Sequence, residues 1–97
     1  MHSRESVLAL LATLKDDLEV RFHVARIGVF GSVSRGEQTP ASDIDILVEF
    51  SRPVGFFTFM ELEDYLSDRL GAPVDLVTPD AIKPRMRERI AGETAYV

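Results

Sequence analysis

Residues 43–50, with the sequence DIDILVEF, constrain the fold of this chain more than any other segment. Asp43 and Asp45 alternate with Ile44 and Ile46, and the segment then becomes mainly apolar. Alternation with a period of two is typical of a strand, and an apolar end is typical of a strand that runs from an exposed edge into a core. We therefore expect a β-strand whose two acids project from one face.

Apolar periodicity and turn residues predict the other elements in the same way. Helices are expected where apolar residues recur at three- and four-residue spacing, and short strands where β-branched residues cluster. Gly31 and Gly71 end the elements before them, and Pro84 begins or kinks the last helix. The expected elements are helix 3–18, strand 24–30, helix 56–70, strand 73–77, helix 79–91 and a short terminal strand at 94–97.

The order of these elements predicts a mixed sheet. Because Gly31 ends the first strand close to where Asp43 begins the second, these two strands should be antiparallel. Residues 51–72 contain a helix and form a connection long enough to join two parallel strands. The fold class is therefore α/β, a small mixed sheet flanked by helices. At 97 residues we expect one domain, residues 1–97.

Composition excludes several classes of protein. The chain is 45% hydrophobic and 28% charged, as in ordinary globular domains, and its longest early apolar run, residues 7–12, is too short to span a bilayer. It contains no cysteine, which excludes disulfides, thiolate nucleophiles and Cys-ligated zinc, and a cytoplasmic location fits best. A net charge of −5 disfavours nucleic acid as the main partner.

The paired acids suggest a metal site. Asp43 and Asp45 on one strand face have α-carbons about 6.5 to 7 Å apart, and their mutual repulsion is relieved if divalent cations bind there. Asp75, flanked by Val74 and Leu76, offers a third carboxylate from the next strand. Oxygen ligands favour magnesium or manganese over zinc, and three carboxylates suit a pair of ions, for which we expect magnesium. The predicted metal ligands are Asp43, Asp45 and Asp75.

The turn after the first strand is predicted to hold phosphate. Gly31 allows backbone to approach a ligand closely, and Ser32 begins a turn whose free N–H groups suit phosphate oxygens. Arg35 could also contact phosphate, although an ion pair with Glu37 or Asp45 explains it equally well.

The segment GSVSRGE, residues 31–37, followed by SDIDILVEF at 42–50, resembles the nucleotidyltransferase superfamily that includes polymerase beta, and in particular its minimal, antitoxin-type members. The resemblance covers nearly the whole chain. It implies a polymerase beta-like nucleotidyltransferase domain that uses ATP and magnesium. It further implies a type VII-like antitoxin that transfers AMP to a tyrosine of a HEPN-type toxin encoded beside it, with Asp43, Asp45 and Asp75 as catalytic residues.

Two other functions stay open at this point. One is transfer to a small molecule, which normally needs a further domain for the acceptor. The other is an antitoxin that neutralises its partner by binding alone. Two surface features are also ambiguous. We expect the basic residues of the last helix to be solvated, and the aromatic residues near the start of the 56–70 helix to belong to the core rather than to a partner surface. These residues are Lys83, Arg85, Arg87 and Arg89, and Phe56, Phe57 and Phe59.

Overall fold

The computed structural model describes residues 3–31, 36 and 43–97. Over these residues the chain forms three α-helices and a four-stranded mixed sheet, which confirms the predicted α/β class. In chain order the elements are α1 (Arg4–Phe22), β1 (Val24–Phe30), β2 (Ile44–Phe50), α3 (Phe56–Leu70), β3 (Val74–Val77), the 3₁₀ turn η1 (Pro79–Ala81), α4 (Pro84–Glu93) and β4 (Ala95–Tyr96).

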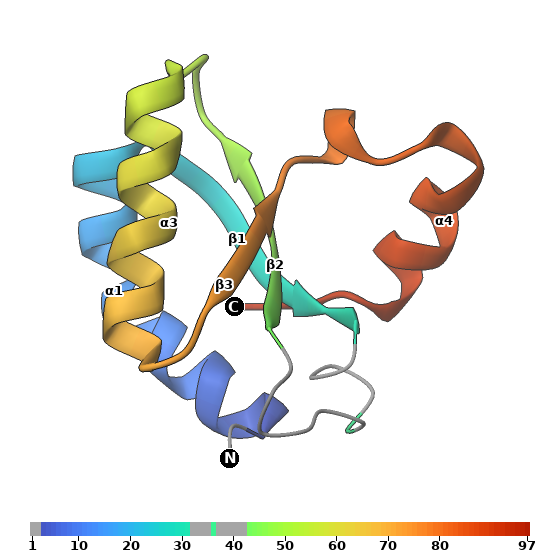
Figure 1. Cartoon of the computed structure of the whole chain (residues 1–97), viewed down its shortest axis with the longest axis horizontal. Helices are drawn as coiled ribbons and strands as arrows, with labels where there is room; N and C mark the ends of the chain where they lie inside the picture. Colours follow the sequence, from blue (N-terminus) through green and yellow to red (C-terminus); the bar gives the residue numbers. More distant parts are fainter. Residues whose placement is uncertain (1–2, 32–35, 37–42) are drawn as a thin grey trace.

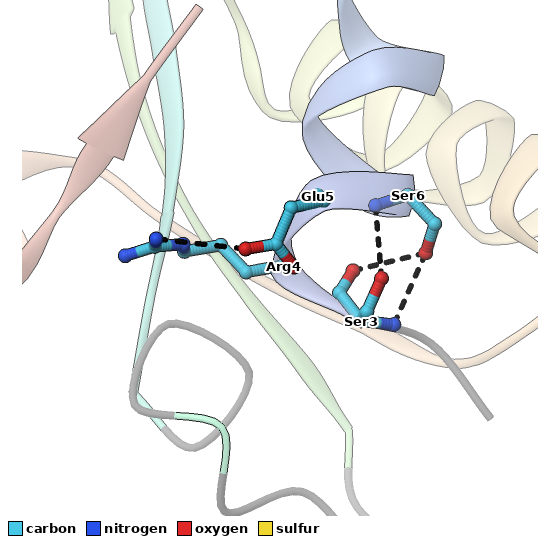
Figure 2. Close-up of polar contacts among 4 residues, drawn as sticks. All are labelled: Ser3, Arg4, Glu5 and Ser6. Carbon is cyan, nitrogen blue, oxygen red and sulfur yellow. Dashed lines mark hydrogen bonds and ion pairs between the residues drawn. The ribbon is translucent and has the colours of Figure 1, made fainter.

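Helix α1 begins at a capping box. The backbone N–H of Ser6 donates to Oγ of Ser3, and the backbone N–H of Ser3 donates to Oγ of Ser6, each over 3.1 Å (Figure 2). The helix extends beyond its predicted end at Leu18 because Phe22, one turn later, is also buried against the core. It ends at His23, which has a left-handed backbone conformation. Neither α1 nor any other helix within the described ranges is long and apolar enough to cross a membrane.

The sheet has the strand order β3-β2-β1-β4. β1 and β2 are antiparallel, and β2 and β3 are parallel, as the sequence predicts. The terminal strand β4 pairs with the other side of β1 and is antiparallel to it. The two longest strands therefore lie at the centre of the sheet, where both of their edges are paired.

The two faces of the sheet have different neighbours. Helices α1 and α3 cover one face, and α4 lies on the other side (Figure 1). Alternate strand residues point towards α1 and α3 and form one core with them, so the residues between them face the opposite way. The buried core residues are Val7, Leu11, Leu18, Phe22, Val24, Ile27, Val29, Ile44, Ile46, Val48, Leu62, Leu66, Leu70, Val74 and Leu76.

The last helix begins later than the sequence pattern predicts. Residues 79–81 form a separate 3₁₀ turn, and α4 starts at Pro84 and continues to Glu93. The residue before a proline avoids the helical region, and Lys83 accordingly has an extended ψ of 136°. Of the two possibilities at Pro84, a start rather than a kink is therefore correct. The basic side chains of this segment are exposed, as predicted: Lys83, Arg85, Arg87 and Arg89.

The prediction that the aromatic residues of α3 belong to the core is wrong for two of the three. Phe56 and Phe57 are 71% and 80% exposed, whereas Phe59 packs against the core. The buried side of α3 is set further along the helix by Leu62, Leu66 and Leu70, which are all buried. With that side facing the sheet, the first two helical residues point into solvent.

Gly28 allows β4 to approach β1. A Cβ atom at this position would lie 2.5 Å from the carbonyl oxygen of Ala95 and 2.9 Å from Cγ2 of Thr94, closer than real Cβ contacts come. We expect Gly28→Ala to lower the free energy of unfolding by about 1 to 3 kcal/mol, because β4 must move away from β1. Urea denaturation measures this change. Gly92→Ala is the control: no atom lies within 4 Å of its Cβ position in α4, so it should be neutral or stabilising.

Candidate active site

Asp45 and Asp75 lie side by side on the sheet face that points away from α1 and α3. Asp45 of β2 is the register partner of Asp75 of β3, and in-register partners on parallel strands project from the same face. Their flanking residues, among them Ile44 and Val74, are buried on the core face. Asp75 is exposed and Asp45 is half-buried. The predicted approach of these two carboxylates from adjacent strands therefore matches the strand register.

Asp43 comes directly before β2 and is exposed. The start of β2 is fixed to the start of β3, since the backbone N–H of Ile44 donates to the carbonyl oxygen of Pro73 over 2.9 Å. Asp43 is thus at the end of the sheet where Asp45 and Asp75 are paired. Because side chains two residues apart in an extended segment project from the same face, Asp43 is expected on the same side as Asp45.

The chemistry of these three residues suits magnesium. All three supply carboxylate oxygens, the ligands that magnesium prefers, and they come from neighbouring positions at one end of two strands. In the described part of the chain, however, no three Asp, Glu, His or Cys side chains lie close enough together to hold a metal ion. The ligand set of Asp43, Asp45 and Asp75 therefore stays a prediction.

Gly31 is in close contact with the Asp45 carboxylate. It follows β1, whose last residue, Phe30, is the register partner of Asp45. The backbone of Gly31 has a φ of +72°, which L-residues with side chains rarely adopt. A Cβ atom here would collide with Oδ2 of Asp45 at well under 3.0 Å. Glycine is thus required both by the backbone conformation and by the proximity of the carboxylate. The other two predicted phosphate-binding residues, Ser32 and Arg35, lie outside the described residues.

Glu93 is a neighbour of this site that the sequence analysis did not identify. The backbone N–H of Gly31 donates to Oε1 of Glu93 over 3.3 Å, across 62 positions of sequence. Glu93 is the last residue of α4, and only Thr94 separates it from β4. The only signal in the sequence is the predicted terminal strand, because pairing of that strand with β1 places the preceding residue near the end of β1.

A cluster of Arg26, Glu49 and Tyr96 holds β4 in place. Nε of Arg26 donates to Oε2 of Glu49 over 2.7 Å, and the Arg26 guanidinium stacks 4.0 Å from the centre of the Tyr96 ring. The hydrogen bond to Glu49 raises the pKa of Arg26, which therefore stays charged. Glu49 is four residues after Asp45, about 13 Å along the strand, so the cluster is separate from the carboxylates. It stabilises the strand that positions Glu93.

A comparison with protein families identifies the domain. The family described as Nucleotidyltransferase domain matches residues 11–97. The chain belongs to this nucleotidyltransferase family. The matched range contains every residue that the sequence analysis assigned to the metal and phosphate sites.

Individual known proteins are similar to this chain over most of its length. Protein adenylyltransferase MntA of Thermococcus cleftensis is 41% identical over 97 residues, which cover all of this chain and 98% of MntA. A solved protein provisionally described as a minimal nucleotidyltransferase is 37% identical with a TM-score of 0.71, over 95% of this chain and 86% of the other. A crystal structure described as a toxin-antitoxin with AMP-PNP is 26% identical with a TM-score of 0.70, over 90% of this chain and 68% of the other. The fold is that of the minimal nucleotidyltransferases.

Substituting Gly31 tests its contact with Asp45. We expect Gly31→Ala to weaken magnesium-dependent ATP binding at least about tenfold, because the new methyl group displaces the Asp45 carboxylate. Isothermal calorimetry measures the affinity. Gly71→Ala is a matched control: its φ of +68° imposes the same backbone strain, but no atom lies within 4 Å of its Cβ position. Equal ATP affinity in the two variants would contradict the importance of the contact.

The Glu93 contact can be measured without any assay of activity. We expect Glu93→Ala to speed hydrogen exchange of the Gly31 amide roughly two- to tenfold, because one hydrogen-bond acceptor is lost. Glu93→Gln keeps an acceptor oxygen and should preserve most of the protection. Glu88→Ala, an exposed position on the same helix, controls for general loosening of α4. Exchange at Gly31 that is unchanged in Glu93→Ala would rule the contact out.

Proposed function

We propose that this chain transfers AMP from ATP to a tyrosine of a HEPN-type toxin encoded beside it, and so acts as the antitoxin of the pair. The observation that carries the proposal is the in-register pairing of Asp45 with Asp75 beside Gly31. Membership of the nucleotidyltransferase family and full-length similarity to a protein adenylyltransferase support it. A similar structure described as a toxin-antitoxin with an ATP analogue supports both the nucleotide and the partner.

In this proposal the carboxylates and the turn after β1 lie side by side and together form the nucleotide site. Asp43 and Asp45 would hold two magnesium ions, and Asp75 would hold one of them. The ions would neutralise the charge of the triphosphate. Gly31 allows the backbone to approach the phosphates closely, the turn that begins at Ser32 offers backbone N–H groups to phosphate oxygens, and Arg35 adds a positive charge. The nucleotide requirement and the absence of cysteine make the cytoplasm the proposed location.

The proposed transfer is a single in-line displacement. The tyrosine hydroxyl oxygen forms a bond to the α-phosphorus of ATP, and the bond from that phosphorus to the oxygen that bridges it to the β-phosphorus breaks. Pyrophosphate leaves with the electron pair of that bond, and Asp75 accepts the hydroxyl proton. The exposure of Asp75 is consistent with this role, since a residue that meets an acceptor from solution must be accessible. The domain contributes mainly position and charge.

Two competing functions make different predictions. An antitoxin that acts by binding alone would neutralise its partner without altering the partner's mass. A transferase for small molecules would act without the partner. The relative MntA, of which the match covers 98%, is described as a protein adenylyltransferase. We therefore favour a protein acceptor.

Asp75→Asn separates binding from transfer. We expect ATP affinity to fall less than about tenfold but turnover to fall at least about 100-fold, because the variant loses the proton acceptor. Intact-mass spectrometry of the toxin after incubation with ATP and magnesium measures transfer as an AMP-sized increment. Asp80→Asn, an exposed carboxylate in η1, is the control and should transfer normally. A toxin that stays unmodified yet fully neutralised by the wild-type chain would contradict transfer and favour binding alone.

A further inference from the structure

The start of α3 exposes two large aromatic side chains that the fold does not use. Phe56 and Phe57 are 71% and 80% exposed, and Met60, one turn further on, is 38% exposed. The N-cap, Gly55, makes no side-chain capping bond, and the first turn contains no acidic residue. Burying a phenylalanine side chain is among the larger hydrophobic contributions to stability, so two exposed ones forgo a substantial stabilisation. Adjacent exposed aromatic residues are typical of a surface that another protein covers.

An acidic row continues the same side of the helix. Glu61, Asp64 and Asp68 follow Phe57 at spacings of four, seven and eleven residues, which places all four on one side of an α-helix. All three acids are exposed, and none forms an ion pair with another described residue. We call this set the α3 surface: Phe56, Phe57, Met60, Glu61, Asp64 and Asp68.

A groove adjoins the aromatic end of this surface. It has a volume of about 780 Å³ and lies between the end of β2, the start of α3 and η1. Phe56 and Phe59 of α3 line it together with Phe50 and Val54. Arg52 and Asp80 also line the groove, so a partner that packs on Phe56 has beside it a recess with both apolar and charged walls.

The α3 surface is separate from the candidate active site. α3 lies against the sheet face opposite to the one that carries Asp45 and Asp75, and its own buried side, with Leu62 and Leu66, packs between (Figure 1). The aromatic end is near Phe50, at the far end of β2 from Asp45, a distance of about 16 Å along the strand. A protein can therefore contact the α3 surface without entering the nucleotide site.

We propose that the α3 surface is the docking site for a protein partner that presents apolar side chains next to a row of lysine or arginine residues. Charge determines the kind of partner: three acids without an ion-pair partner among the described residues, next to exposed aromatic side chains, favour a partner whose surface is basic and partly apolar. A second copy of this chain would bring acidic row against acidic row at a net charge of −5 each. The identity of the partner as the toxin rests on the proposed function, and docking would hold the toxin whether or not ATP is bound.

The test measures affinity for the purified toxin in the absence of ATP. We expect Phe57→Ser to weaken binding at least about tenfold, as loss of an aromatic anchor does. Met60→Ser and Met86→Ser form a matched pair, since these methionines are 38% and 37% exposed but lie on α3 and α4. Met60→Ser should weaken binding and Met86→Ser should not. The double variant Glu61→Lys with Asp64→Lys should weaken binding and reduce its dependence on salt.

The outcomes distinguish this proposal from the proposed function. Magnesium-dependent ATP affinity should be unchanged in all of these variants, which also shows that they fold. If the wild-type chain binds the toxin without modifying it, and Phe57→Ser abolishes binding, the docking surface stands and transfer fails. Toxin affinity that is unchanged in Phe57→Ser and in the charge variant would overturn the docking surface and leave transfer untouched. A dimer of the free chain that Phe57→Ser converts to a monomer would also overturn it, in favour of a second copy.

Discussion

The in-register parallel pairing of β2 with β3 is the constraint on which the rest of this structure depends. It aligns Asp45 with Asp75 on one face and, on the other, aligns Ile44 with Val74 in the core. A slip of one residue would turn a carboxylate into the core and an isoleucine into solvent. Because a buried, unpaired carboxylate is far more costly than any single contact, hydrophobic burial itself fixes the register of the two acids.

The parts of the fold that follow from local patterns could be predicted from the sequence. The bounds of β1 and α3 agree with the predicted strand at 24–30 and helix at 56–70, because β-branched clusters, helical periodicity and the terminal Gly71 are local signals. The strand orientations follow from the length of the connections. Given these orientations, the alternation of residues within each strand is enough to predict that Asp45 and Asp75 share one face of the sheet. The role of Ser32 and Arg35 in phosphate binding stays a prediction.

The parts that depend on distant contacts could not be predicted. Phe56, Phe57 and Phe59 are all apolar, and their spacing in the sequence does not distinguish them. Which of them is buried depends on how Leu62 and Leu66 pack α3 against the sheet. The contact of Glu93 with Gly31 requires β4 to pair with β1 through the close approach at Gly28. Neither result is encoded in a window of neighbouring residues, because each depends on packing between elements far apart in the chain.

If the α3 surface docks the acceptor protein as we propose, its separation from the carboxylates affects how a small transferase selects its acceptor. A protein held at the α3 surface reaches the nucleotide site as a tethered group, so its effective concentration there depends on docking rather than on contacts at the reacting hydroxyl. The carboxylates then need only position the phosphate and receive a proton. Under this proposal, selectivity for the acceptor would lie in Phe57 and the acidic row, on the far side of a close-packed core that keeps the two sites at a fixed distance.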